Sequence, residues 1–402
     1  MPENRAGHFQ VIGVEDDPFV LPELPDKKRL LIMALLAGLI TGLGMLTRYA
    51  FGWVIVPVAI YLMLFGGVRG ARLASWSFLS FALTVTPWII RNVSVSGTWF
   101  GTAGYAVLED SPIFPNSKLM QSLNPDLTDY YYGWFRYAAR KFIDNIRMIL
   151  QGDLLRLAGG WVLVLFLAGL LLGLLNSTAR RLRYFTVMCL GVFLVAQALG
   201  RTQLSNISPD INSENLLVLL IPLVAIFGVA FFITLLSQMK TPSWGVRVAV
   251  VILMVVVSCQ ALLARLLPPY PSPLAWPNYN PPEIQKVSGW MKPTELMMSD
   301  TPWAVAWYGG RQCAWTTVNC GYEFYQLNDN YKKISALYLT ISTLDDKLLS
   351  ECYLGTPDSW GNFSLKLLTL GKEPDKFPLF ILRSDSTAAA VFLTDKDRWK
   401  TQ

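Results

Sequence analysis

Charged residues are scarce in this sequence. Of its 402 residues, 15% are Asp, Glu, Lys or Arg and 53% are hydrophobic, whereas about a quarter of a soluble globular domain is charged. The mean hydropathy is +0.38. This composition argues against an ordinary soluble protein and predicts a membrane protein.

Histidine and CxxC motifs are also lacking. The one histidine, His8, lies in a polar leader, so the chain has no histidine-based metal centre and no Ser/His triad. Cys189 and Cys259 fall in apolar runs, where packing as small hydrophobic side chains is expected. Three cysteines near the C-terminus allow one disulfide, and their spacing leaves the pairing open: Cys313, Cys320 and Cys352.

Neither sign of charge is in large excess. There are 34 Lys and Arg against 28 Asp and Glu, a net charge of +6. No nucleic-acid-binding motif is found, so no nucleic-acid partner is expected. In a membrane protein, a small excess of Lys and Arg sets the orientation of the loops and interacts with anionic lipid headgroups. No cofactor is evident, and a divalent cation stays open as an alternative.

Long apolar runs fill residues 29–267. A helix needs roughly 20 apolar residues to cross a bilayer, and seven runs approach that length. The predicted fold is therefore a polytopic α-helical membrane protein with about seven spans, followed by a small α/β domain. The predicted spans are 30–46, 50–65, 73–90, 157–175, 184–200, 215–236 and 248–267.

Lysine and arginine are distributed unevenly among the short connections. Connections on one side of a seven-span bundle would hold Lys27, Lys28, Arg29, Arg69, Arg72, Arg180, Arg181, Arg183, Lys240 and Arg247. The opposite short connections hold only Arg48 and Arg201. Because basic loops stay in the cytoplasm, residues 1–28 are predicted to be a cytoplasmic leader and 91–156 an extracytoplasmic loop. The leader lacks the apolar core of a signal peptide.

Residues 268–402 have the pattern of an extracytoplasmic α/β domain. Short β-type runs alternate there with helical stretches. Strands are predicted at 303–308, 335–341, 378–383 and 390–393, and helices at 283–291 and 344–352.

An aromatic cluster lies in the first of these predicted strands. Aromatic faces there suit carbohydrate binding, but Trp303, Val305 and Trp307 would share one face of a strand, which favours a core role. The whole cluster is Asp300, Pro302, Trp303, Trp307, Tyr308 and Arg311.

Two arginines mark the outer ends of the first and third predicted spans. Arg48 and Tyr49 lie between two apolar runs, and Arg91 and Asn92 follow Trp88 where the third run ends. A guanidinium is suited to bidentate contact with a phosphate, so these residues are candidates for holding an anionic lipid headgroup. The alternative is a pair of interfacial arginines that reach water or cap helix ends.

The loop between the third and fourth runs offers two weaker candidates. Glu109 and Asp110 form an adjacent acid pair that could supply a general base, although solvated acids are the commoner case. Further along, Phe135, Ala138, Ala139, Phe142, Ile146 and Ile149 recur at helical spacing and predict an amphipathic helix on the membrane surface. Its candidate sugar or lipid contacts are Tyr131, Tyr132, Trp134, Arg136 and Arg140.

Three pieces of the sequence resemble the GT-C superfamily of integral-membrane glycosyltransferases, in the protein O-mannosyltransferase and aminoarabinose transferase branch. They are GLITGLGMLTRYAFGWVIVPVAIYLML, TPWIIRNVSVSGTWF and SDTPWAVAWYGGR. The resemblance implies sugar transfer from a polyprenyl-phosphate carrier to an acceptor on the outer face of a bacterial inner membrane. Arg48 and Arg91 would then neutralise the leaving phosphate.

One departure from that family concerns the catalytic carboxylate, which the resemblance places in the first outward loop. Here that loop is Thr47-Arg48-Tyr49 and contains no acid. The match is thus to the C-terminal part of such enzymes, and three explanations stay open: a second polypeptide supplies the N-terminal helices, the gene is truncated, or the chain is inactive alone. The alternatives are a non-catalytic scaffold subunit and a transporter of lipid-linked glycans, which should show charged or broken spans.

Overall fold

The computed structural model describes residues 26–173, 176–202, 214–238, 243–260, 280–340, 343, 357–370, 377–384 and 390–399. The chain divides into two compact units. The helical unit comprises Met1–Ala106, Ala139–Arg201 and Glu214–Pro268, and the α/β unit comprises Val107–Ala138, Thr202–Ser213 and Pro269–Gln402. The predicted loop thus contributes a segment, Val107–Ala138, that groups with the α/β unit.

Apolar helices occur at all seven predicted positions. Four are long and apolar enough to cross a membrane: Lys27–Thr47, Gly67–Ser96, Ser177–Gly200 and Leu216–Gln238. Three are shorter within the described residues: Tyr49–Phe65, Trp161–Leu170 and Trp244–Ser258. The chain is therefore a mostly helical protein with membrane-spanning candidates, and seven crossings stay a prediction.

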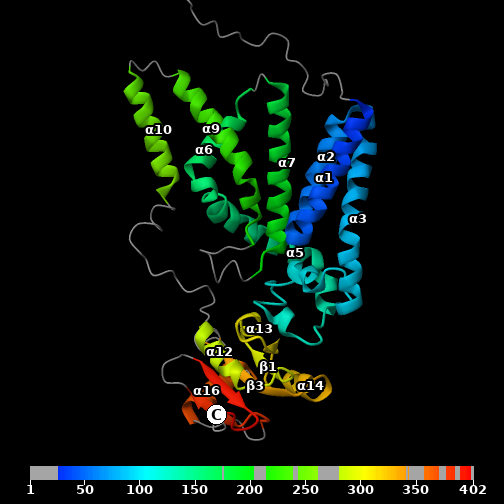
Figure 1. Cartoon of the computed structure of the whole chain (residues 1–402), viewed down its shortest axis with the longest axis vertical. Coiled ribbons are helices and arrows are strands. Elements are labelled where there is room, and N and C mark those ends of the chain that lie inside the picture. The colour runs from blue at the N-terminus through cyan, green and yellow to red at the C-terminus, as the bar shows by residue number, and fades with distance from the viewer. Residues whose placement is uncertain are drawn as a thin grey trace, which may run out of the picture. The chain divides into compact units, whose positions relative to one another are not determined.

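The helices of the helical unit pass back and forth along one bundle (Figure 1). In chain order its elements are α1 (Lys27–Thr47), η1 (Tyr49–Val54), α2 (Ile55–Phe65), η2 (Gly67–Arg69), α3 (Gly70–Ser96), η3 (Gly101–Val107), the second half of α5 (Thr128–Met148), η4 (Ile149–Asp153), η5 (Leu157–Gly159), α6 (Trp161–Leu170), α7 (Ser177–Gly200), η7 (Leu216–Leu220), α9 (Ile221–Gln238) and α10 (Trp244–Ser258). Helices α1, α3 and α7 run in the same direction, so their C-terminal ends lie at one end of the bundle.

Small residues bring α1 and α3 into close contact. A Cβ atom added at Gly38 would lie 2.0 Å from the carbonyl oxygen of Ser77, and one added at Gly42 would lie 2.8 Å from the Cβ of Thr84. The Ser80 hydroxyl donates a hydrogen bond to the carbonyl oxygen of Leu35 at 2.9 Å. Small residues and interhelical hydrogen bonds are the usual means of joining helices in lipid. This packing fixes the ends of α1 and α3 beside each other.

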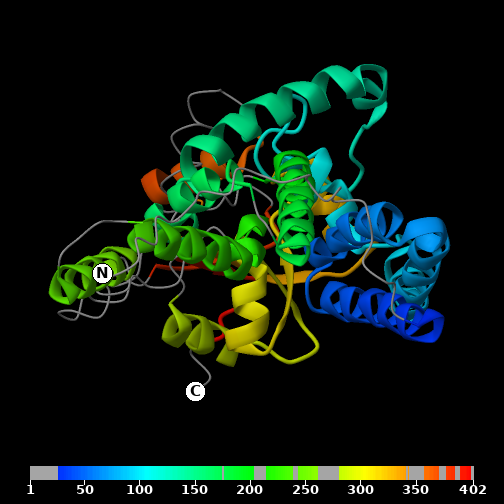
Figure 2. The same ribbon diagram turned by 90° about the horizontal axis from the view of Figure 1, so that it is seen from above.

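The hydrophobic core cluster of the helical unit is built by η4, η5, α6, α7, η7 and α9. Phe166, Phe193 and Leu217 are fully buried there. Viewed along the bundle, α7 lies between the α1–α3 group and the α6, α9 and α10 group (Figure 2). It therefore joins the two groups of helices.

Helix α5 confirms the predicted helix but not the predicted membrane-facing side. Phe142 and Ile146 pack against the bundle core, and Ile149, just past the helix, is a buried member of it. Phe135, in contrast, is 73% exposed. The bundle thus covers the C-terminal part of the predicted apolar face, and the placement of this helix on the membrane surface stays a prediction.

The α/β unit contains a five-stranded sheet in the order β2-β1-β3-β5-β4. Its parallel strands are β2 (Gln312–Trp315), β1 (Leu296–Ser299) and β3 (Ile334–Leu339), and β5 (Val391–Thr394) is antiparallel to both β3 and β4 (Ile381–Ser384). The helices of this unit are α4 (Lys118–Gln121), the first half of α5, α12 (Pro281–Gly289), α13 (Pro302–Gly309), α14 (Tyr322–Asn330) and α16 (Trp360–Leu370).

Most predicted elements of this unit are found. Strands β3, β4 and β5 confirm the predicted strands at 335–341, 378–383 and 390–393, and α12 confirms the helix at 283–291. The predicted helix at 344–352 lies outside the described residues apart from its flanks.

The strand predicted at 303–308 is wrong, because these residues form helix α13. Pro302 occupies the first turn, where its missing N–H costs nothing, and Gly310 ends the helix in the left-handed conformation at φ 59°. Ala304 and Val305 are buried, whereas Trp303 and Trp307 are exposed. The two tryptophans are therefore not core residues, contrary to the prediction.

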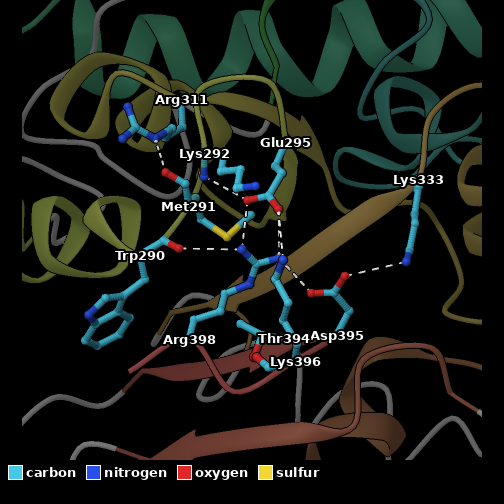
Figure 3. Close-up of polar contacts among 10 residues, drawn as sticks. All are labelled: Trp290, Met291, Lys292, Glu295, Arg311, Lys333, Thr394, Asp395, Lys396 and Arg398. Carbon is cyan, nitrogen blue, oxygen red and sulfur yellow. Dashed lines mark hydrogen bonds and ion pairs between the residues drawn. The ribbon is translucent and has the colours of Figure 1, made fainter. Parts of the chain in front are cut away.

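The amino ends of the parallel strands are tied together by an ion-pair cluster (Figure 3). The buried Arg398 guanidinium donates to Glu295, directly before β1, at 2.8 Å and to Asp395, directly after β5, at 2.7 Å. Lys396 lies 3.8 Å from Glu295 and Lys333 lies 3.5 Å from Asp395. The C-terminal segment is thereby fastened to the sheet.

The segment Val107–Ala138 is bound into the α/β unit near the carboxyl ends of the parallel strands. The side chain of Gln121 donates to the Thr316 hydroxyl at 3.1 Å, and the Ser122 hydroxyl donates to the Glu323 carboxylate at 3.0 Å. Leu119, two residues before Gln121 in the chain, is buried. This segment is thus part of the folded unit.

Candidate functional site

The predicted lipid-binding residues meet where α1 and α3 end. The hydroxyl oxygen of Tyr49 accepts hydrogen bonds from the indole nitrogen of Trp88 at 2.7 Å and from the side-chain nitrogen of Asn92 at 3.2 Å. Asn92, which is buried, also donates to the carbonyl oxygen of Trp99 at 3.2 Å. We call Tyr49, Trp88, Arg91 and Asn92 the Tyr49 cluster.

Local sequence explains how these side chains converge. Arg48 adopts an extended conformation that ends α1 and turns the chain into η1. Helix α3 continues past Pro87 and ends at Gly97, which has φ 70° and accepts the left-handed conformation at little cost. Trp88 and Asn92 are four residues apart on α3 and so share the face turned toward Tyr49.

Both predicted arginines accompany this cluster. The guanidinium carbon of Arg91 lies 4.9 Å above the centre of the Trp88 ring, a cation–π arrangement. Arg48 directly precedes Tyr49, and both arginines are exposed. The structure therefore brings Tyr49, Arg91 and Asn92 together through Trp88, with Arg48 adjoining in sequence.

The hydrogen-bond arrangement at Tyr49 leaves one donor available. A phenolic hydroxyl carries one hydrogen and two acceptor sites. Trp88 and Asn92 supply two donors to that oxygen, and within the described residues the Tyr49 hydrogen itself has no acceptor. A tyrosine O–H and two guanidinium groups make a donor-only surface, which suits an oxyanion such as a phosphate.

The acid pair Glu109 and Asp110 belongs to the α/β unit. Glu109 is 5% exposed, so the picture of a solvated acid does not hold for it. Asp110 has φ 52°, a left-handed conformation that an aspartate tolerates better than most residues. The role of either acid as a general base stays a prediction.

The candidate contacts on α5 are exposed where they are described. Tyr132 is 90% exposed, and Trp134, Arg136 and Arg140 are also exposed. Arg140 lies 3.9 Å from Asp144 in a solvent-exposed pair. The side chain of Tyr131 lies outside the described part of the helix.

A buried polar network in the helical unit escaped prediction. One oxygen of Asp153 accepts hydrogen bonds from the Gln197 amide at 2.7 Å and from the Arg201 guanidinium at 3.1 Å. The Gln197 carbonyl accepts from the backbone N–H of Leu216 at 3.0 Å. The network thus links η4, α7 and η7. In the sequence, only Gln197, Gly200 and Arg201 at the end of the apolar run 184–200 indicated it.

The cysteines of the α/β unit show no disulfide between Cys313 and Cys320. Burial, with a smaller contribution from the charge of Asp300, raises the pKa of the Cys313 thiol. Cys352 lies outside the described residues, so a bond to it stays a prediction. In the described part of the chain, no group of three or more His, Cys, Asp or Glu side chains is arranged to hold a metal ion.

Comparison of this chain with protein-family models, with curated proteins and with solved structures finds no match. Fold and site together define a helical protein with membrane-spanning candidates, an α/β unit and a donor-rich cluster at one end of its helices. Function is therefore argued from that cluster.

Proposed function

We propose that this chain is a membrane glycosyltransferase of the GT-C type, which takes a sugar from a polyprenyl-phosphate carrier. The Tyr49 cluster and Arg48 would bind the carrier phosphate. The observation that carries the proposal is the Tyr49 hydroxyl: Trp88 and Asn92 fill its two acceptor sites, and its hydrogen has no acceptor among the described residues.

The chemistry of the cluster supports a phosphate over other ligands. Asn92 and Trp88 hold the phenol in place, so its donor is preorganised and little rotamer entropy is lost on binding. Arg48 and Arg91 add charge at the ends of apolar helices, where a lipid-linked anion arrives with its tail in the bilayer. The tail of a carrier lipid would therefore contact the apolar helices while its phosphate accepts hydrogen bonds from the cluster.

The expected topology places this cluster on the outer face. Seven crossings, with the basic starts of α1, α3 and α7 in the cytoplasm, would put Arg48 and Arg91 on the extracytoplasmic side. The α/β unit would then also be extracytoplasmic. The membrane would be a bacterial inner membrane.

The reaction is a displacement at the anomeric carbon. An acceptor hydroxyl forms the new C–O bond, the bond to the carrier phosphate breaks, and the electron pair leaves with the phosphate. The hydroxyl proton passes to a base, for which Glu109 and Asp110 stay weak candidates. Arg48 and Arg91 would stabilise the charge that develops on the phosphate, as preorganised donors do in other enzymes.

The test begins with carrier binding. Arg48→Gln and Arg91→Gln are each expected to weaken polyprenyl phosphate binding about tenfold, roughly 1.4 kcal/mol. Binding is measured as the thermal shift of the purified full chain with added lipid. Arg72→Gln, an exposed arginine in the first turn of α3 and so at its opposite end, is the matched control and should behave as wild type.

Transfer is tested separately with a radiolabelled polyprenyl-phosphate sugar. Label in a product with wild type, and about a hundredfold less with Arg48→Gln/Arg91→Gln, would support the enzyme. Saturable carrier binding without transfer would favour the scaffold alternative. Unchanged binding in both arginine variants would refute the phosphate site.

A further inference from the structure

The exposed face of α13 carries two large aromatic side chains. Trp303 and Trp307 lie one turn apart and are 42% and 83% exposed, and Ala306 between them is exposed as well. Trp315, at the end of β2, meets the Trp303 ring edge to face, with ring centres 5.4 Å apart. We call Trp303, Trp307 and Trp315 the indole surface.

This surface lies beside the carboxyl ends of the parallel strands. Trp315 pairs in register with Ser299, the last residue of β1. The chain moves from β1 to β2 on one side and then crosses to β3 on the other, so the strand order reverses at β1. Open α/β sheets bind their ligands outside the carboxyl ends of strands at such a reversal.

Buried hydrogen bonds fix the position of α13 at this edge. Asp300 follows β1, and one of its carboxylate oxygens accepts from the backbone N–H and the hydroxyl of Thr340 at 2.9 Å and from the Thr343 hydroxyl at 2.8 Å. These bonds join the ends of β1 and β3 directly before the first turn of α13. Asp300 is therefore a positioning residue for Trp303.

The chemistry of the surface restricts its ligand. Helix α13 contains no charged residue, and Arg311 beyond it donates to the carbonyl oxygens of Met291 and Gly310. A charged ligand would thus find no countercharge on helix α13 itself. Within the described residues, the indole nitrogen of Trp315 is buried and has no hydrogen-bond acceptor. Leaving such a donor unsatisfied costs roughly 1–3 kcal/mol.

From these observations we infer that the indole surface binds the pyranose rings of a neutral glycan. A pyranose offers a flat face of C–H groups for the exposed indoles and hydroxyl oxygens for the indole N–H of Trp307, which is 83% exposed. Lipid chains offer the first but not the second. This inference goes beyond the proposed function, because it requires binding and no transfer.

The test uses the full chain in detergent and three neutral probes, namely linear oligosaccharides of glucose, mannose and N-acetylglucosamine. Binding is measured by calorimetry and by saturation-transfer NMR. At least one probe should bind saturably, and Trp303→Ala and Trp307→Ala should each weaken it at least fivefold. Trp244→Ala removes a similarly exposed tryptophan of α10 and is the matched control.

Two results would overturn the inference. One is the absence of saturable binding by all three probes. The other is quenching of Trp307 fluorescence by brominated lipids in nanodiscs, compared with the Trp307→Phe variant, which would assign this face to the membrane interface. Arg48→Gln should leave glycan binding unchanged, so failure of the phosphate site and failure of the glycan site are distinguishable.

Discussion

Buried charge is arranged differently in the two units. In the helical unit, Asp153 meets one cation, Arg201, and one neutral amide, Gln197. In the α/β unit, Arg398 is held between Glu295 and Asp395. Lysines extend that second cluster to water, whereas the first is enclosed by the apolar bundle.

The difference follows from the cost of removing charge from water. That cost is several kcal/mol for each ion and is recovered only by good geometry and further hydrogen bonds. In the α/β unit, Lys333 and Lys396 are 68% and 56% exposed, so solvent shares the cost. In the bundle, the anion Asp153 pairs with the cation Arg201, so the pair has no net charge. The Gln197 side chain also accepts a hydrogen bond from the backbone N–H of Leu216.

The largest expected effect is at Arg398. Arg398→Met leaves two carboxylates together without their cation, and removing one partner of a buried ion pair costs about 3–5 kcal/mol. Urea unfolding of the full chain, followed by proteolysis of the α/β unit, measures the loss. Lys333→Met removes only an exposed partner and should cost under about 1 kcal/mol. Equal losses in the two variants would show that burial does not distinguish them.

A smaller effect is expected in the bundle. Asp153→Asn keeps the shape but loses the charge-assisted bond to Arg201, at a cost of about 2–3 kcal/mol. Asp153→Asn/Arg201→Met should regain part of that loss, because no uncompensated charge stays buried. Thermal unfolding in detergent compares the three proteins. A double variant less stable than the single one would mean that Arg201 has a further partner of greater weight.

The smallest effect is a pH dependence confined to the α/β unit. Burial alone raises the pKa of Glu295, but hydrogen bonds from Arg398 and the Lys292 N–H, with the charges of Arg398 and Lys396, outweigh burial and lower it. The folded state then favours the ionised form. This stability is fully present above the unfolded pKa of about 4.3 and is lost as pH falls through the folded value.

Urea midpoints of the α/β unit from pH 7 to pH 3 measure this dependence. They should fall across the acid range in wild type and more shallowly in Glu295→Gln. An identical slope in both proteins would assign the acid sensitivity to other carboxyls.

The sequence pattern predicted the apolar helices well, because long apolar runs have few alternatives. It also named Tyr49, Arg91 and Asn92, which the structure brings together. The run WAVAWY was predicted as a strand, because six apolar residues fit a strand or a helix equally well. Pro302 at its start and Gly310 at its end favour the helix that the structure shows. Asp153 was missed because its partners lie 44 and 48 positions away in the chain.

The binding of Gln121 and Ser122 to Thr316 and Glu323 has a practical consequence for dissecting the protein. A fragment starting at residue 269 would lack α4 and would leave Thr316, which is buried in the full chain, without its amide partner. A single protease cut after the bundle would likewise not release a complete α/β unit, since Val107–Ala138 would stay with the helices. Studies of its ligands therefore call for the intact polypeptide.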